Sequence, residues 1–439
     1  MTLNIRSRKL PRGGLDGFNS SLRQIKDVFG IKWLESHGDH PLMKLWIRTD
    51  AFASIQLHQF GYSLRKIKYL NPKWFDDAID KIIKNNTGER RGVVLEVLVA
   101  SQLHSPPDRV VELPHPNNPG YDIKVKHSNN SVIYYQVKNN NWSDQYYIMR
   151  EKARSVEEIL EANLGSEALQ VIIKINIEPE ERDWHSLKDQ LPTLLRDTSS
   201  EEDAERNIEG RWIIRIRKLH APGNRLHPTK KTYVMQLITP IPQTEKNNIA
   251  GDIDEACDVL EKKKEQDTET SINIALICVP LDAPFALCSD WVNDFYFVDH
   301  PKARVSGVLL YKPGVVTDID NETDIFSHAY HLVIKKEKED WIKALSTLDI
   351  AVGRGSFSVE GTNNLDNFNQ LYEGDTRDDY KGYHIYQSGH INYLIIGLGS
   401  IKTHSYFGIQ ERVFYTDSDR QEKEATADLS QDIDLVLLR

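Results

Sequence analysis

Four polar side chains in the first third of the chain occupy positions that a packed core alone explains poorly: Glu96, Asp122, Gln136 and Lys138. Two carboxylates offer hard oxygen ligands to Mg²⁺, which usually takes one or two of them and leaves its other positions to water and phosphate. Such a metal lowers the pKa of a bound water and polarises a phosphoryl oxygen, and a nearby lysine can orient the water or offset charge developing on phosphorus. The set therefore suits hydrolysis of a phosphodiester.

A helix is expected to carry the first of these groups. The run at 92–103, GVVLEVLVASQL, is apolar except for Glu96, whose neighbours three and four residues away are small or apolar. A carboxylate buried without a partner is costly or shifts its pKa. A cation or a charged side chain is therefore expected beside Glu96.

Two strands are expected to carry the other three groups. In 121–128, Asp122 alternates with apolar residues, and in 131–139 Gln136 and Lys138 share one face, roughly 7 Å apart. The short link HSNNS between the two runs suits a hairpin. If this hairpin packs against the helix at 92–103, all four side chains can converge at one end of a sheet.

This arrangement resembles the PD-(D/E)xK nuclease superfamily, whose fold is the restriction-endonuclease-like fold. The motif reads Glu96, then PGYD ending at Asp122, then Gln136-Val137-Lys138. A helix expected at 145–165 and a strand at 168–177 would complete the α/β core of that family, in the order αβββαβ. The resemblance spans residues 90–178, and it departs from the family at Gln136, where an acid is usual. A Gln variant is similar to that of some modification-dependent restriction nucleases.

The resemblance implies a Mg²⁺-dependent endonuclease, with Mn²⁺ as a substitute, that cuts DNA in restriction or antiphage defence. Glu96, Asp122 and Gln136 would be the metal ligands, because an amide oxygen can still ligate a metal or position water. Lys138 would position water or stabilise the transition state. A homodimer, or association with an ATPase or sensor partner, is compatible with this reading.

Each residue taken singly also has a structural explanation. Glu96 could pair with Arg90 or Arg91, Asp122 could neutralise a neighbouring lysine, and Lys138 could be a solvated strand residue. A competing hypothesis keeps the fold but makes the protein a nucleic-acid-binding or scaffold subunit that has lost metal competence at Gln136. Metal-dependent cleavage of DNA separates the two hypotheses.

Composition limits the other function classes. The 439 residues carry a formal net charge of -10, so the chain as a whole is not attracted to nucleic acid and any such contact must be local. Three cysteines lack metal-ligand spacing and fit a reducing compartment. No apolar run reaches the length of a membrane span and the N-terminus lacks the apolar core of a signal peptide, so a cytoplasmic protein without membrane contact is expected.

Two basic segments are the candidate nucleic-acid contacts. Within the helix expected at 145–165, the bases precede the acids, an order that opposes the helix dipole unless a phosphate lies near its start. The interval 211–231 holds seven Lys or Arg residues and no acid. Ion pairs along the helix surface are the alternative for the first segment. A solvated hairpin face is the alternative for 211–231. The candidates are Arg150, Lys152, Arg154, Arg215, Arg217, Arg225, Lys230 and Lys231.

The expected organisation has four parts. A basic arm and a helical region occupy 1–88, with Pro41 and Pro72 as helix-start residues. The nuclease-like core occupies 89–180, acidic helices with a basic strand and loop occupy 181–245, and a C-terminal α/β domain occupies 246–439.

Overall fold

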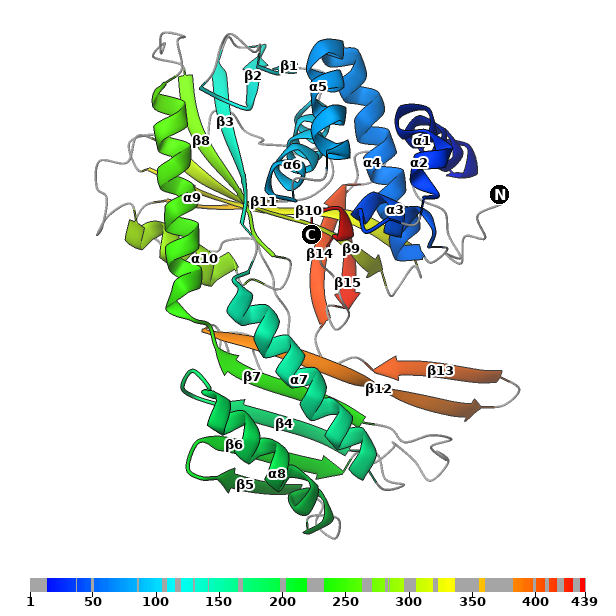
Figure 1. Ribbon diagram of the computed structural model, residues 1–439, viewed down its shortest axis with the longest axis vertical. Coiled ribbons are helices and arrows are strands. Elements are labelled where there is room, and N and C mark those ends of the chain that lie inside the picture. The colour runs from blue at the N-terminus through cyan, green and yellow to red at the C-terminus, as the bar shows by residue number, and fades with distance from the viewer. Residues whose placement is uncertain are drawn as a thin grey trace.

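The computed structural model shows a mixed α/β protein with N-terminal helices and two mixed β-sheets, consistent with two α/β domains (Figure 1). It describes residues 14–36, 38–48, 51–84, 87–104, 109–114, 120–128, 131–140, 142–164, 169–197, 203–218, 233–262, 271–280, 283, 285–295, 305–318, 323–335, 355–359, 382–397, 400–406, 410–416, 422–428 and 435–438. Among the helices within these ranges, none is both long and apolar enough to cross a membrane.

Helices fill the N-terminal region, as expected. Pro41 and Pro72 each occupy the first helical position, where the missing N–H costs no hydrogen bond. The residues before them cap the helices: His40 Nδ1 accepts from the Leu42 N–H at 3.1 Å, and Asn71 Oδ1 accepts from the Trp74 N–H at 3.0 Å. The helices are α1 (Gly14–Phe29), α2 (Ile31–Leu34), α3 (Pro41–Trp46), α4 (Ala51–Leu70), α5 (Pro72–Ile83) and α6 (Thr87–Leu103).

Close packing of α1 against α4 depends on Gly61. A Cβ atom added there would lie 2.2 Å from the backbone oxygen of Ser21, much closer than any real Cβ contact. A larger residue at this position would force the two helices apart.

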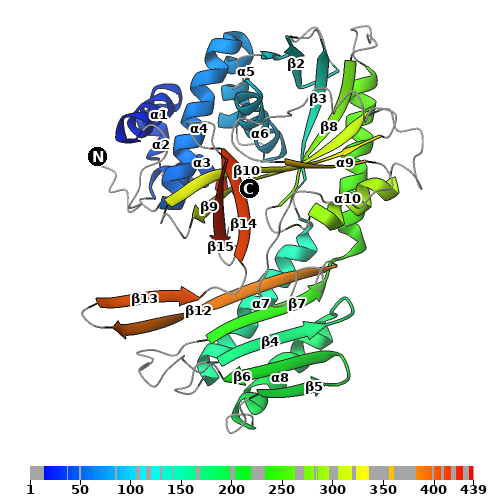
Figure 2. The same ribbon diagram turned by 180° about the vertical axis from the view of Figure 1, so that it is seen from behind.

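The first sheet has the strand order β1-β2-β3-β8-β9-β10-β11. Its first three strands form an antiparallel meander, and β8 then pairs with β3 in parallel. The N-terminal helices lie on one side of this sheet, and α9 (Gln243–Glu261) with α10 (Phe285–Asp294) on the other (Figures 1 and 2). The strands are β1 (Arg109–Glu112), β2 (Ile123–His127), β3 (Val132–Asn139), β8 (Ser271–Cys278), β9 (Gly307–Asp318), β10 (Thr323–Ile334) and β11 (Gly355–Val359).

The second sheet has the order β13-β12-β7-β4-β6-β5, with α7 (Asp144–Asn163) and α8 (Glu181–Asp197) packed on it (Figure 2). Its central strands β4 (Leu169–Ile175) and β7 (Tyr233–Pro240) are parallel. The remaining strands are β5 (Asp203–Ile208), β6 (Trp212–Lys218), β12 (Tyr383–Gly397) and β13 (Ser400–Tyr406). A separate hairpin joins β14 (Gln410–Thr416) to β15 (Glu422–Asp428), and a short 3-10 helix, η5 (Val436–Leu438), follows.

One expected neighbour relationship is wrong. The helix and strand expected to follow Lys138 in the nuclease core do form, as α7 and β4, but they belong to the second sheet. The strand beside β3 is β8, and α9 precedes it. Burial gives the physical reason: β4 alternates between buried and partly exposed residues, whereas β8 is continuously buried over its last five residues, as a central parallel strand must be.

The second sheet is therefore an insertion into the first. Residues 144–240 leave the first sheet after β3, and the chain returns to it through α9. The strand β12 then extends the inserted sheet by pairing with β7. The expected boundary between residues 180 and 181 falls within this insertion, and the one between residues 245 and 246 falls within α9.

Two apolar cores cover the two faces of the first sheet. Ile133, Tyr135 and Val137 of β3 pack into the core shared with α6. Tyr134, which points to the other face, belongs to the core that includes α7, α9 and the second sheet. Because β3 contributes to both cores, the side chains near its C-terminal end have rigid surroundings.

Candidate active site

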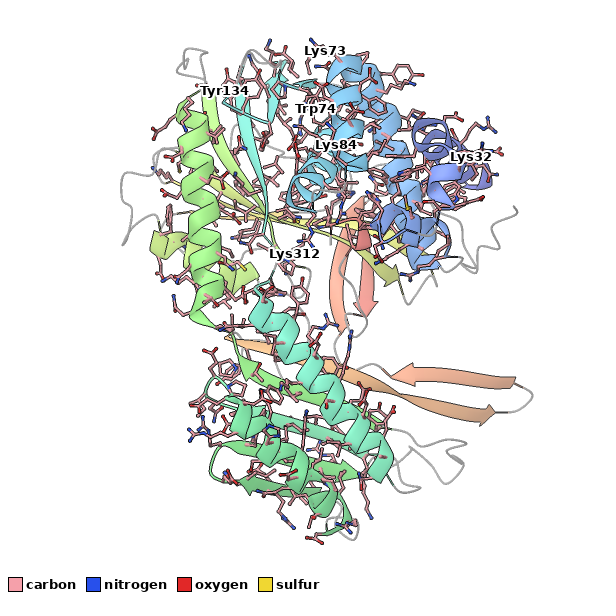
Figure 3. All side chains as sticks on the ribbon, in the orientation of Figure 1. Lys32, Lys73, Trp74, Lys84, Tyr134 and Lys312 are labelled. Atoms are coloured by element: carbon pink, nitrogen blue, oxygen red, sulfur yellow. The ribbon has the colours of Figure 1, made fainter. Side chains whose placement is uncertain are left out.

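One pocket of about 330 Å³ receives Glu96, Asp122, Gln136 and Lys138. Glu96 comes from α6, Asp122 directly precedes β2, and the other two lie on β3. Tyr134, labelled in Figure 3, marks the same strand two residues before Gln136. Further lining residues come from α5, the start of α6, β3 and α9: Lys81, Gly88, Glu89, Arg91, Gly92, Val93, Val137, Asn139 and Asp252.

The backbone of the meander fixes Asp122. Its N–H donates to the Tyr135 carbonyl at 2.9 Å, and its Oδ2 accepts from the Val137 N–H at 2.8 Å. Burial raises the pKa of Asp122 to about 6, although the Val137 N–H, the Lys138 charge and the Gln136 amide all favour the ionised form. The carboxylate is thus held rigidly in a place where its charge is poorly solvated.

Glu96 reinforces this negative site. Burial, and then the nearby charge of Asp122, raise the pKa of Glu96 well above its ordinary value, while Lys81 and Lys138 oppose the rise. Two carboxylates that each raise the cost of ionising the other attract a cation strongly. The pair therefore has the electrostatics of a cation site.

Gln136 brings an unused oxygen to the same place. Its side chain donates a hydrogen bond to Asp122, and only 6% of the residue is exposed. Its Oε1 atom is buried and has no hydrogen-bond partner among the described residues. A buried carbonyl oxygen without a donor is costly, so a metal ion or a water is its natural partner.

Lys138 is held by α9. Its Nζ lies 2.5 Å from Oε1 of Glu255. One turn earlier on the helix, Asp252 accepts from Asn140 Nδ2 at 2.7 Å, and burial raises the pKa of Asp252. The helix that follows the insertion thus closes the pocket and places two further acids near Lys138.

These oxygens fit Mg²⁺ or Mn²⁺ better than zinc. In the part of the chain that the structure describes, no group of three His, Cys, Asp or Glu residues could hold a metal ion. Glu96 and Asp122 supply two carboxylates, and the third available oxygen is the orphaned Oε1 of Gln136. Mg²⁺ usually binds through one or two carboxylates, whereas structural zinc takes four nitrogen or sulfur ligands.

The predicted nucleic-acid contacts on α7 lie outside this pocket. Arg150 donates to the Tyr146 hydroxyl at 3.2 Å and lies over that ring at 5.6 Å from its centroid. Lys152 pairs with Glu181 of α8 at 2.5 Å, and Arg154 is exposed. Intramolecular contacts thus account for Arg150 and Lys152 without a phosphate.

The basic strand of the second sheet is also partly neutralised. Arg215 and Arg217 both contact Asp203 of β5, with shortest distances of 2.8 and 3.2 Å. These two guanidinium groups, Arg215 first, lower the pKa of Asp203 to about 2, so the carboxylate stays ionised at neutral pH. Arg225, Lys230 and Lys231 lie outside the described residues.

Sequence reasoning gave no functional role to five charged residues at or beside the pocket: Lys81, Glu89, Arg91, Asp252 and Glu255. Arg91 carried a usable signal, because it lies five residues before Glu96 in the same helix. The acids of α9 carried none, since the whole insertion separates them from β3 and their helix has an ordinary amphipathic pattern.

Comparisons with protein-family models, with curated proteins and with solved structures give no match. The function of the site must therefore follow from its chemistry.

Proposed function

We propose that the protein is a metal-dependent nuclease of the PD-(D/E)xK type that hydrolyses phosphodiester bonds, most readily those of DNA. The observation that carries the proposal is the convergence of four side chains on a single pocket: Glu96 from α6, Asp122 from the residue before β2, and Gln136 and Lys138 from β3. The topology of the first sheet also supports the proposal. An antiparallel meander is followed by a crossover helix and by a strand parallel to β3, which is the element order of that core. In this assignment α9 and β8 complete the core.

Each residue has a chemical role in the proposal. Glu96, Asp122 and Oε1 of Gln136 would hold Mg²⁺ or Mn²⁺. When bound there, the ion would lower the pKa of a water and polarise a phosphoryl oxygen. Lys138 would offset the negative charge that develops on the phosphoryl oxygens or orient the attacking water.

The protonation states suit neutral or mildly basic conditions. With a pKa of about 6, Asp122 is ionised at pH 7.5 and able to bind a cation. Binding of the cation would draw the remaining proton from the carboxylate pair. The proposed activity should therefore rise between pH 6 and pH 8.

A second candidate is a nucleic-acid-binding scaffold without cleavage chemistry. Two observations favour it: Gln136 stands where the family has an acid, and Lys138 is paired with Glu255. The nuclease proposal also has a partner-dependent form, in which the protein cuts DNA only after an ATPase or sensor partner binds it during restriction or antiphage defence. In that form the isolated chain would show no cleavage.

Cleavage assays decide between these candidates. Supercoiled plasmid, linear duplex DNA and RNA are incubated with Mg²⁺, Mn²⁺ or EDTA and with wild type, Asp122→Asn or Lys138→Ala. We expect metal-dependent cutting of DNA that falls by at least about 100-fold in either variant. The matched control is Lys73→Ala, which removes an exposed charge at the start of α5 (labelled in Figure 3).

Two results would change the assignment. Equal cutting by wild type and Lys138→Ala would show that the pocket is not the active site. Retention of DNA in a gel shift without cutting by any form would favour the scaffold.

A further inference from the structure

Two glycines precede Glu96 on the face of α6 that lines the pocket, with Glu89 and Val93 beside them. Gly88, Gly92 and Glu96 follow one another at four-residue spacing, so they lie on one face of the helix, and all three line the pocket. A Cβ atom added at Gly88 or at Gly92 would meet no atom of the described residues within 4 Å. The helix surface between its first turn and the carboxylate is thus open to an extended ligand.

Arg91 lies beside this open face and also lines the pocket. Its Nε atom is buried, and neither a hydrogen-bond acceptor nor a carboxylate partner is found for it in the described ranges. Burial lowers the pKa of Arg91, and the ionisable neighbour that opposes this is the Tyr147 phenol, which is uncharged at neutral pH. Arg91 is therefore a permanently charged, partly desolvated cation for which the described part of the chain supplies no anion.

The other cations of the pocket have partners. Lys81 lies 3.8 Å from Glu89, and Lys138 lies 2.5 Å from Glu255. Desolvating a guanidinium without compensation is unfavourable, so an anionic ligand at Arg91 would offset a cost that the folded chain otherwise bears. A guanidinium suits a phosphate in particular, because its N–H groups can pair with two phosphate oxygens at once.

We propose that Arg91 binds a backbone phosphate next to the scissile one, in a strand that runs along the Gly88 and Gly92 face of α6. The inference rests on the proposed nuclease function, since it takes the scissile phosphate to lie at Glu96 and Asp122. The phosphate could be an internal diester or a terminal phosphate at a strand end. Arg91 is then a substrate-binding residue that fixes the register of the strand.

Fluorescence anisotropy in EDTA tests the site without cleavage. Fluorescein-labelled DNA is titrated with wild type, Arg91→Ala, Arg91→Lys and the control Lys73→Ala. We expect Arg91→Ala to weaken binding about tenfold and to lower the slope of log K against log salt concentration by about one. Arg91→Lys should fall between wild type and Arg91→Ala, because a lysine keeps the charge but loses the two-pronged contact, and Lys73→Ala should bind as wild type does. If Arg91→Ala lowers the melting temperature, Arg91→Gln, which keeps the length of the side chain, takes its place.

Three DNA substrates separate the sources of the phosphate. Circular single-stranded DNA and 5′-hydroxyl oligonucleotides lack a 5′-terminal phosphate, whereas 5′-phosphorylated oligonucleotides carry one. Weakened binding of all of them by Arg91→Ala indicates an internal diester, and weakened binding of the phosphorylated oligonucleotide alone indicates a terminal phosphate.

The outcomes distinguish this inference from the nuclease proposal. If wild type cuts DNA and Arg91→Ala matches it in both Kd and KM, the phosphate site is refuted while the nuclease stands. If wild type binds DNA through Arg91 but does not cut, the phosphate site stands without the cleavage chemistry. If wild type does not bind DNA in EDTA, the phosphate site is refuted, and the cleavage assays with Mg²⁺ or Mn²⁺ decide the nuclease proposal separately.

Discussion

The Nζ atom of Lys138 lies 2.5 Å from Oε1 of Glu255, so the proposed catalytic cation of β3 is tied to the helix that re-enters the first sheet. The Lys138 side chain is 15% exposed and that of Glu255 is 65% exposed. A pair with one exposed partner is screened by solvent and contributes little to stability. Lys138 can therefore exchange Glu255 for a substrate phosphate at small cost.

Substitution of Glu255 by Gln should release Lys138 without unfolding the protein. Because the pair is worth at most about 1 kcal/mol, we expect a change in the free energy of unfolding below that value and a cleavage rate that rises by up to about fivefold. Single-turnover cleavage and thermal unfolding measure the two effects. Asp254→Asn, which removes an exposed charge from the same helix, is the control and should change neither. A Glu255→Gln rate as low as that of Lys138→Ala would instead make the pair essential for positioning.

Stability in the absence of metal should depend on pH through Asp122. Its pKa is raised from 3.8 to about 6 on folding, so the folded state binds the proton more tightly than the unfolded state. The resulting stabilisation is present below pH 4 and is lost as pH rises through 6. Asp122→Asn removes this loss, and we expect the variant to be more stable than wild type at pH 8 by about 3 kcal/mol. Urea unfolding in EDTA at several pH values measures the difference, and Asp254→Asn should follow wild type throughout.

Added metal should make wild type more stable than Asp122→Asn at pH 8. Mg²⁺ or Mn²⁺ that binds only the folded state raises its stability according to concentration and affinity. We expect wild type to gain melting temperature on addition of Mn²⁺ at pH 8 and Asp122→Asn to gain little. An equal gain in both proteins would show that the cation binds elsewhere.

Gln136→Glu tests whether the amide limits the affinity for metal. A third carboxylate adds charge to the set formed with Glu96 and Asp122, and more ligand charge strengthens binding of a hard cation. We expect calorimetric titration to show tighter binding of Mn²⁺, on the order of tenfold, and unfolding in EDTA to show a loss of about 1 kcal/mol from repulsion. Gln136→Met has a similar length and no oxygen, so it should weaken binding. Unchanged affinity in both variants would exclude Gln136 as a ligand.

The basic face of β6 should bind DNA more strongly once its acid is removed. Arg215 and Arg217 share Asp203, which competes with phosphate for them. We expect Asp203→Asn to tighten DNA binding about threefold and the double variant Arg215→Ala/Arg217→Ala to weaken it, in both cases with a changed salt dependence. Lys32→Ala, an exposed charge on α2 (labelled in Figure 3), is the control for loss of charge alone. If all four proteins bind alike, β6 does not contact DNA.

Local patterns in the sequence predicted the parts of the site that lie close together in the chain. Alternation within two short strands, joined by a tight link, was enough to place Asp122 beside the Gln136 and Lys138 strand, and an apolar helix with one acid indicated Glu96. The partner of β3 could not be predicted in this way. The helix α7 and the strand β4, which follow β3 in the chain, have the periodicity expected of the core. Only its continuous burial distinguishes β8 as the strand that lies beside β3.

The charges around the site were less predictable for a similar reason. Asn140 and Asp252 are hydrogen-bonded across 112 residues of sequence, and no local pattern links them. Conversely, the basic runs suggested free cations, although Lys152, Arg215 and Arg217 have acidic partners on neighbouring elements. Runs of charge indicate where bases are located, and only the fold determines which of them are already paired.

The insertion between β3 and α9 sets an order of events during synthesis. Val132 of β3 pairs with Ser271 of β8, so a growing chain contains Glu96, Asp122, Gln136 and Lys138 long before the strand that anchors β3 has left the ribosome. Pairing β3 with β8 across such a long interval has a large entropic cost of loop closure unless the inserted segment is already compact. Asp252 of α9 lines the pocket and follows the inserted strands in the chain, so the pocket can be completed only after residues 144–240 have been synthesised.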